Sequence, residues 1–244
     1  MGTLTIEHEK KGIVLLSGGL DSATVAAIAL ERNYHIIGLS FDYGQRHRIE
    51  LEMSKKLAKH YSIEQKIFKI DLTQIGGSSL TSNIKVEEGN LQRDKNELPN
   101  TYVPSRNIMF ITIAASLAET IGFNTIFIGA NALDYSGYPD CRPEFFEAMT
   151  RALNSGTRIG INEEFHIEVP LQKLRKSEII TIGTSLGVPY EMTHSCYEGN
   201  KKACGKCDSC LLRLRGFMEA GIKDPIEYDF LPDFYKQVSV KTND

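Results

Sequence analysis

The chain has 244 residues, a formal net charge of −3 and a pI near 6.1, and hydrophobic residues make up 41% of it. This composition excludes a largely disordered chain, and the weak acidity argues against a protein that coats nucleic acid. No apolar run approaches the roughly 20 residues of a membrane-spanning helix, and the N-terminus lacks a signal-peptide core, so we expect a soluble, cytoplasmic protein.

Strand-like and helix-like segments alternate along most of the chain. Apolar strands joined by crossover helices predict a Rossmann-like α/β fold, with a parallel sheet and helices on both faces. We divide the chain into an α/β domain at 1–190 and a C-terminal zinc-binding helical region at 191–244. The predicted elements are strands at 12–16, 35–41, 65–70, 124–129 and 165–169, and helices at 22–32, 46–61, 107–121, 143–154, 177–186 and 208–220.

Three further local predictions concern loops and helix starts. The polar segment 71–104 interrupts the alternation, and a loop of this length is usually functional or mobile. Within it, we expect 81–100 to form a mobile lid. Ser105 and Ser177 are expected N-caps, because a serine hydroxyl can accept a hydrogen bond from the first turn of a helix.

The segment Ser17–Ser22 joins the first strand directly to the first helix and reads Ser-Gly-Gly-Leu-Asp-Ser. Adjacent glycines allow a turn whose N–H groups form an anion nest, and the helix N-terminus adds partial positive charge. An ordinary glycine-rich turn is the alternative, but the full string favours a site for the phosphates of ATP. The expected nucleotide-binding residues are Leu16, Ser17, Gly18, Gly19, Leu20, Asp21, Ser22, Ala23 and Thr24.

Other polar residues are expected at the same edge of the sheet, because ligands of open parallel sheets bind at the carboxyl ends of the strands. Asp21 is a candidate ligand for Mg²⁺ that neutralises the phosphates. Arg46 and His47, after the second strand, either reach phosphate or belong to a polar loop that precedes the next helix. Arg106 and Asn107 open the central helix, where an anion would meet the helix start.

The loop after the fourth strand combines two tyrosines, two aspartates, an arginine and a thiol, which suits a flat polar heterocycle. A tight turn packed on the sheet is the alternative, and Cys141 has the usual character of a small buried residue. We expect catalysis to involve Asp21, Ser22 and Arg106. The expected substrate-binding residues are Arg106, Asn107, Asp134, Tyr135, Ser136, Tyr138, Asp140, Cys141 and Arg142.

Four of the five cysteines lie close together near the C-terminus, at Cys196, Cys204, Cys207 and Cys210. Four thiolates at this spacing match a closed tetrahedral zinc site, and Gly205 eases the tight turn that such a site needs. Disulfides are less consistent with a cytosolic chain, whereas an iron–sulfur cluster uses the same ligands. A zinc ion with four sulfur ligands has no open position, so its expected role is structural.

These motifs together resemble the 7-cyano-7-deazaguanine synthase family of the ATP pyrophosphatase (PP-loop) superfamily. The resemblance spans roughly residues 12 to 228 and rests on 17–22, 43–47, 103–107, 134–142, the cysteines and 216–221. It implies an adenine nucleotide alpha hydrolase-like fold and a carbon–nitrogen ligase that acts in queuosine biosynthesis. It further implies a homodimer, which binds neither membrane nor nucleic acid.

The reaction implied by the resemblance converts 7-carboxy-7-deazaguanine and ammonia to the nitrile 7-cyano-7-deazaguanine (preQ0). ATP would adenylate the carboxylate, ammonia would give the amide, and a second ATP would activate the amide oxygen.

Two other functions are considered. One is a related adenylating enzyme acting on tRNA, which predicts extra RNA-binding domains. The other is a zinc-knuckle module for nucleic acid, which predicts basic residues around the cysteines. Lys201, Lys202, Lys206, Arg213 and Arg215 agree with the second, but it leaves the phosphate loop unexplained.

Overall fold

The computed structural model describes residues 9–91, 97–132 and 137–236. In this part of the chain, strands and helices alternate as the apolar patterns predict, and the bounds differ by a few residues at most ends. The strands are β1 (Lys10–Leu15), β2 (Tyr34–Asp42), β3 (Glu64–Lys69), β4 (Thr125–Phe127) and β5 (His166–Glu168). The helices are α1 (Leu20–Glu31), α2 (Ile49–His60), α3 (Arg106–Ile121), α4 (Pro143–Gly156), α5 (Arg158–Asn162), α6 (Lys176–Ser185), α7 (Asp208–Glu219) and α8 (Asp233–Lys236).

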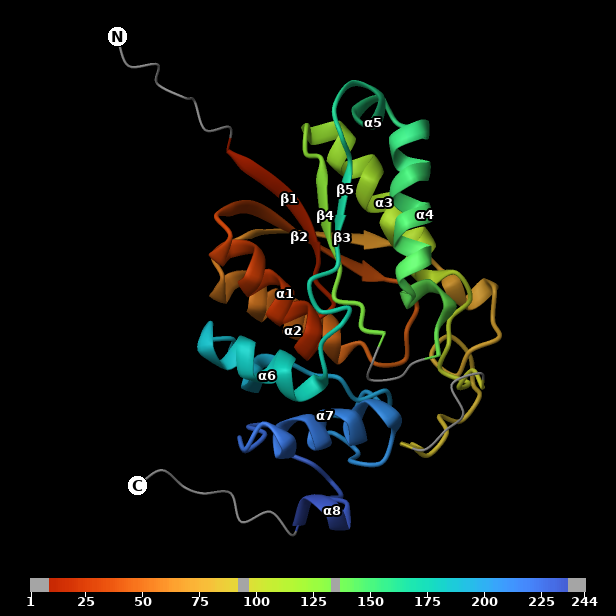
Figure 1. The fold of residues 1–244 in the computed structure, drawn as a ribbon. Helices are drawn as coiled ribbons and strands as arrows, with labels where there is room; N and C mark the ends of the chain where they lie inside the picture. The colour runs from red at the N-terminus through yellow and green to blue at the C-terminus, as the bar shows by residue number, and fades with distance from the viewer. Residues whose placement is uncertain (1–8, 92–96, 133–136, 237–244) are drawn as a thin grey trace.

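The sheet has five parallel strands in the order β3-β2-β1-β4-β5 (Figure 1). The chain builds outward from β1 through β2 to β3, then crosses back to β4 on the other side of β1. In open parallel sheets, such a reversal leaves a crevice at the carboxyl ends of the two central strands, where ligands bind. The predicted Rossmann-like fold is therefore confirmed, and it directs the search for a site to the ends of β1 and β4.

Each face of the sheet is covered by its own hydrophobic core. On one face, side chains such as Ile13, Leu39 and Ile126 pack against α3 and α4. On the other face, Val14 and Phe127 pack against α1, α2 and α6. Adjacent residues of a strand point to opposite faces, so Ile13 and Val14 enter different cores. This two-sided burial explains why the central strands β1, β2 and β4 contain apolar runs, whereas the edge strand β3 is polar and mostly exposed.

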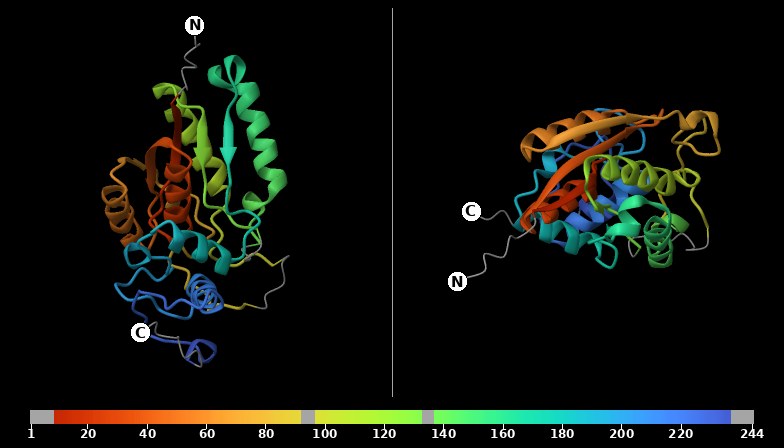
Figure 2. Two further views of the ribbon diagram at one scale, coloured as in Figure 1. Left: turned by 60° about the vertical axis from the view of Figure 1, so that its left-hand side comes forward. Right: turned by 90° about the horizontal axis from the view of Figure 1, so that it is seen from above.

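The C-terminal part of the chain lies beyond the carboxyl ends of the strands. Figures 1 and 2 show α7 next to α6 at this edge, with α8 further out. Phe217 of α7 is fully buried in the core that also holds α1 and α6. The cysteine-bearing segment that leads into α7 is therefore held against the opening of the crevice. No helix in the described ranges is long and apolar enough to cross a membrane.

The structure corrects three predictions of helix starts and finds two short helices that were missed, α5 and α8. The helix expected from 46 begins at Ile49, and residues 43–48 form a loop. Ser177 lies inside α6, which is capped by Arg175, whose N–H donates to the Glu178 carboxylate at 2.7 Å. Ser105 precedes α3 but has φ of 57° and makes no side-chain cap.

Candidate active site

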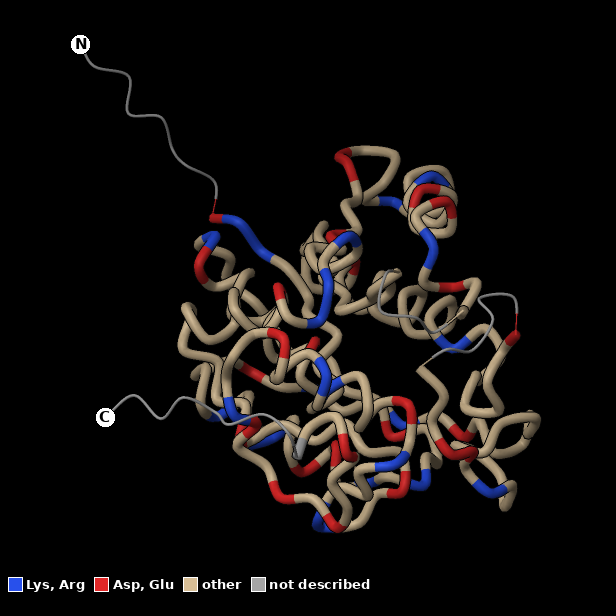
Figure 3. Tube along the Cα trace, turned by 60° about the horizontal axis from the view of Figure 1, so that its bottom comes forward, with Lys and Arg blue, Asp and Glu red and all other residues tan. Residues whose placement is uncertain are grey.

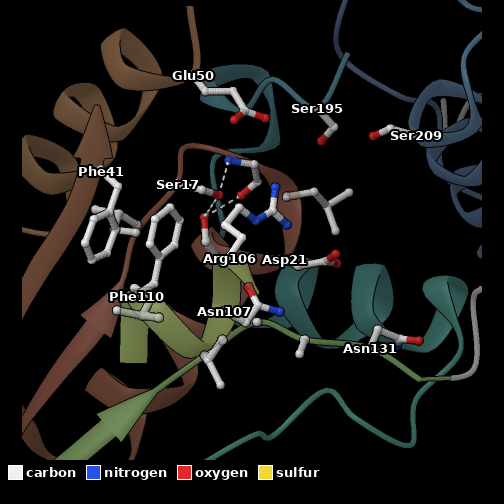
Figure 4. A pocket seen from close by; sticks show the side chains of 18 of the residues that line it. Ser17, Asp21, Phe41, Glu50, Arg106, Asn107, Phe110, Asn131, Ser195 and Ser209 are labelled. Atoms are coloured by element: carbon white, nitrogen blue, oxygen red, sulfur yellow. Dashed lines mark hydrogen bonds between the residues drawn. The ribbon is translucent and has the colours of Figure 1, made fainter. Parts of the chain in front are cut away.

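A pocket opens at the carboxyl ends of β1, β2 and β4 (Figure 4). The phosphate loop Ser17–Ser22 and the start of α3 line it, together with the first turn of α2. Ser195, Tyr197 and Ser209, which neighbour the clustered cysteines, line it from the side of the C-terminal region. The cysteine-bearing segment thus forms one wall of the pocket at the crevice.

The phosphate loop satisfies much of its own hydrogen bonding. The Gly19 N–H donates to Ser17 Oγ at 3.2 Å, and the Gly18 N–H donates to Ser22 Oγ at 3.3 Å. The first backbone bond of α1 runs from Ala23 N–H to the Gly19 carbonyl at 3.1 Å, so the amides of residues 20–22 precede the helical ladder. Such N–H groups, at the positive end of the α1 dipole, are suited to bind an anion.

The two glycines of the phosphate loop, Gly18 and Gly19, differ in their surroundings. Gly18 has φ of 98°, and a Cβ on it would overlap the carbonyl oxygen of Glu50 in α2. Its lack of a side chain therefore permits both the turn and the close packing of the loop on α2. Gly19 lines the pocket, whereas Gly18 does not.

Two of the expected nucleotide-binding residues point away from the pocket. Thr24 is fully buried, and its hydroxyl bonds the Leu20 carbonyl and the Tyr190 hydroxyl, each at 3.0 Å. Ala23 is also fully buried, in the core between α1 and the sheet. One turn into α1, the side chains at these positions face the core rather than the carboxyl edge, so their contact with a nucleotide stays a prediction.

Asp21 forms an ion pair with Lys176, the first residue of α6. Lys176 Nζ lies 2.8 Å from Oδ1 and 2.9 Å from Oδ2 of Asp21, and both residues line the pocket. Only 12% of the Lys176 side chain is exposed. A magnesium ion at Asp21 would share its carboxylate with this ammonium group. The pair places a positive charge beside the phosphate loop that the sequence analysis missed.

Arg106 lies in a group of tyrosines at the start of α3 and lines the pocket. Burial alone would lower the pKa of its guanidinium, but the nearby groups of Tyr43, Tyr138 and Asp140 raise it above the ordinary value. Burial also raises the pKa of Tyr43 to about 12. The tyrosines therefore stay neutral and the guanidinium stays charged, which makes Arg106 a fixed cation in the pocket.

The expected substrate-binding residues fall into two groups. Arg106, Asn107, Tyr138 and Cys141 line the pocket. Asp140 does not: it is buried and accepts the Asn107 N–H at 3.0 Å, which satisfies a free amide at the start of α3.

Arg142 is exposed and precedes α4 without lining the pocket. Neither Asp140 nor Arg142 lines the pocket, because the turn after 137 uses these positions to begin helices, and their contact with substrate stays a prediction. Asp134, Tyr135 and Ser136 lie outside the described residues.

Arg46 and His47 take different directions. The Arg46 guanidinium is exposed and donates to the carbonyls of Ser82 and Ile84, at 3.1 and 3.0 Å. It holds the long loop in this structure, which agrees with the alternative of a polar loop, and its contact with phosphate stays a prediction. His47 is buried and lines the pocket, where its Nε2 lies 3.1 Å from Oε2 of Glu50.

The four clustered cysteines converge as a metal site requires. Their sulfur atoms all lie within 4.8 Å of one another, and Cys204 Sγ is 3.9 Å from Cys210 Sγ. A tetrahedron of zinc–sulfur bonds of about 2.3 Å has sulfur–sulfur edges of about 3.8 Å. Hydrogen bonds from the other three thiols hold the pKa of Cys196 far below its ordinary value. These residues could therefore hold a metal ion.

The basic residues near the cysteines do not form a free cationic surface. Arg213 is 2% exposed and bonds Asp224, and Lys202 pairs with Glu227 at 3.3 Å. Arg215 lies 3.8 Å from Glu219, and Lys206 sits over the ring of Phe230. Figure 3 shows blue and red segments intermixed over this side of the molecule. Four of the five basic residues thus have an acidic or aromatic neighbour and only Lys201 has none among the described residues, which weakens the support that they gave to a nucleic-acid module.

Comparison with known proteins identifies the family. The family model of the "Queuosine biosynthesis protein QueC" matches residues 11–221. The chain belongs to the QueC family. It is 59% identical over 229 residues to a protein of Thermoplasma acidophilum, with 94% of this chain and 96% of the relative covered. It is 60% identical over 226 residues to one of Picrophilus torridus, with 93% and 95% covered. Both relatives are named 7-cyano-7-deazaguanine synthase.

The QueC match covers the elements that build the pocket, from β1 to the end of α7. Among solved structures, the chain is similar to an NMN synthetase from Francisella tularensis at 17% identity. That similarity covers 89% of this chain and 79% of the other with a TM-score of 0.47, which is too low to bear on function.

Proposed function

We propose that this protein is a 7-cyano-7-deazaguanine synthase, which uses ATP and ammonia to convert 7-carboxy-7-deazaguanine to the nitrile. The observation that carries the proposal is the pocket itself. It combines an anion-binding loop with two fixed cations, Lys176 and Arg106, in a chain of the QueC family. Two anionic substrates, ATP and a carboxylate, would meet in such a pocket.

The cations have separate places in the proposed reaction. Lys176 adjoins Asp21 at the phosphate loop, where it would stabilise the charge that develops as pyrophosphate leaves. Arg106 lies among Tyr43, Tyr138 and Tyr197, where a guanidinium can hold a carboxylate by two parallel hydrogen bonds. Asn107 and Phe110 line the same end of the pocket and offer an amide and an aromatic ring to a flat heterocycle.

The direct test is a turnover assay. Purified protein is incubated with ATP, Mg²⁺, ammonium chloride and 7-carboxy-7-deazaguanine, and the products are identified by mass spectrometry. We expect the nitrile together with two AMP per nitrile, because the carboxylate and then the amide are each activated by one ATP. Release of ADP instead of AMP, or no nitrile from metal-replete protein, would contradict the proposed function.

We further propose that the bound metal is zinc and that its role is structural. Four buried or half-buried thiols that converge in a tetrahedron suit Zn²⁺ and leave no open coordination position. The metal would hold Ser195, Tyr197 and Ser209 at the pocket and thereby tie residues 191–244 to the α/β domain.

Elemental analysis of the purified protein is expected to find about one zinc per chain. Replacement of Cys207 by Ser should abolish stoichiometric zinc and lower the melting temperature. Cys141, which lies outside the cluster, provides the matched control, since Cys141→Ser should retain the zinc. Iron and labile sulfide in the purified protein would instead indicate an iron–sulfur cluster.

The remaining proposals concern Mg²⁺, assembly and location. Asp21 is the proposed Mg²⁺ ligand, and Lys176 competes with the metal ion for its carboxylate.

We propose a cytoplasmic homodimer. The edge strand β3 supports the dimer, because Ile67 is 38% and Phe68 is 44% exposed on it. Light scattering tests the dimer. A solution mass equal to that of one 27.3 kDa chain would contradict it.

A further inference from the structure

Glu50, in the first turn of α2, places a carboxylate in the pocket beside the phosphate loop. Its side chain is 15% exposed, and Figure 4 shows it on the same side of the pocket as Ser17. Its backbone carbonyl packs directly on Gly18. A carboxylate so close to a phosphate site repels both ATP and a carboxylate substrate. Its presence therefore calls for a ligand of the opposite charge.

His47 fixes this carboxylate in place. Its side chain is 3% exposed, its Nε2 lies 3.1 Å from Glu50 Oε2, and its buried Nδ1 has no partner within the described ranges. The Nε2–H of His47 can therefore donate a hydrogen bond to Oε2 of Glu50. The other carboxylate oxygen, Oε1, has no hydrogen-bond partner among the described residues.

Three ligands could in principle approach Glu50 Oε1: Mg²⁺, an N–H group of the heterocycle, or ammonium. For Mg²⁺, the proposed function already has a carboxylate ligand, Asp21, on the phosphate loop itself. The heterocycle is disfavoured because Asn107 and Asn131 lie on the other side of the pocket from Glu50 (Figure 4). Ammonium is small and positively charged, and it must approach a substrate carbon that is being activated at the phosphate loop.

We propose that Glu50 binds the incoming ammonium ion and accepts its protons, and that His47 is a positioning residue that holds Glu50. This inference rests on the proposed function. In the first half-reaction, ammonium gives one proton to Glu50 and becomes ammonia. The nitrogen forms a bond to the carboxyl carbon, AMP leaves with the electron pair of the broken C–O bond, and the nitrogen loses a second proton.

The second half-reaction removes the two protons left on the nitrogen. The amide oxygen attacks the α-phosphate of a second ATP, pyrophosphate leaves, and the nitrogen gives one proton to Glu50. The C–O bond then breaks with AMP leaving, the last proton is transferred, and the C≡N bond is complete. Glu50 releases each proton to solvent before it accepts the next. One carboxylate beside the loop therefore serves both half-reactions.

The experiment compares the wild-type protein with Glu50→Gln and with Glu52→Gln, an exposed residue of the same helix. Initial rates of AMP release are measured against ammonium chloride at saturating ATP, Mg²⁺ and carboxylate. We expect Glu50→Gln to lower kcat/KM for ammonium by about 10²-fold or more. Binding of a non-hydrolysable ATP analogue should stay within about twofold, and Glu52→Gln should behave as the wild type.

Two further variants test the role of His47 and guard against misfolding. His47→Gln keeps an N–H that can reach Glu50 and should retain more activity toward ammonium than His47→Leu, with the difference in KM for ammonium. Glu50→Asp keeps the charge but draws it back by one methylene. Glu50→Asp should show a smaller loss of kcat/KM for ammonium, with the other substrates unaffected. If Glu50→Gln does not fold, Glu50→Asp tests the role of Glu50 in its place.

The outcomes separate this inference from the proposed function. A wild-type protein that makes no AMP and no nitrile contradicts the proposed function. An active wild type whose dependence on ammonium is unchanged by Glu50→Gln overturns the role of Glu50 alone. If the variant instead needs more Mg²⁺, or shows a raised KM for the carboxylate with ammonium unaffected, Glu50 serves the metal or the heterocycle and the inference is wrong.

Discussion

Lys176→Met is expected to reduce kcat by about 10²- to 10³-fold, because one fixed positive charge at a developing anion is worth that much in an enclosed site. Lys176 is 12% exposed and lies at the end of α6 that faces the phosphate loop, with both Asp21 oxygens within 2.9 Å. Methionine keeps the length and most of the packing of lysine but removes the charge. The loss should therefore appear in the rate rather than in the fold.

The matched control is Lys173→Met, which removes an exposed charge three residues earlier in the same connection. It should leave both kcat and stability within experimental error. Rates of AMP and nitrile formation are measured for both variants, with thermal unfolding as a check. Unfolding should change little in Lys176→Met, since ion pairs of partly exposed groups contribute about 1 kcal/mol or less. Full activity of Lys176→Met would remove this lysine from the phosphate site.

Lys176 also shows which part of the site could not be predicted from the sequence. The strands, the parallel sheet and the phosphate loop follow from local patterns: apolar runs, crossover helices, and two glycines between a strand and a helix. The cysteine cluster follows from spacing. Lys176 has no such pattern, because a single lysine at the start of a helix is common. It reaches Asp21 only because β5 lies next to β4 and delivers α6 to the pocket.

Arg46 and Asp140 show a related limit of sequence reasoning. Arg46 was expected at phosphate, but the loop after β3 returns to it and supplies two carbonyl acceptors. Asp140 was expected at the substrate, but the start of α3 leaves the Asn107 N–H free to bond it. In both cases, a polar side chain satisfies a backbone group that is distant in the sequence. Which backbone group a polar side chain will pair with cannot be read from residue type alone.

The C-terminal region illustrates the same dependence on distant contacts, through the buried ion pair of Arg213 and Asp224. Arg213 Nε lies 2.8 Å from Asp224 Oδ2, and the two side chains are 2% and 1% exposed. Arg213 also donates to Thr193 Oγ1 at 2.6 Å. His194, which follows Thr193 in the chain, donates its backbone N–H to the Gly18 carbonyl at 3.0 Å. The pair therefore connects the end of the chain with the phosphate loop.

Asp224→Asn should lower the free energy of unfolding by about 3 kcal/mol, because it leaves the buried Arg213 charge without its counterion. For a chain of this size, the melting temperature should fall by roughly 6–12 °C. Asp229→Asn, five residues later and exposed, is the matched control and should leave the melting temperature unchanged. Thermal unfolding of the metal-replete proteins measures both effects.

Removing one member of this buried ion pair should cost more stability than removing both, and a double variant tests this difference. Removing one member of a buried pair strands a charge, whereas removing both members leaves only apolar surface and altered hydrogen bonds. Arg213→Met combined with Asp224→Asn should therefore recover part of the stability that Asp224→Asn loses. If the double variant is instead as unstable as the sum of the single variants, the stability comes from separate contacts, such as the bond from Tyr228 to Asp224, and not from the charge pair.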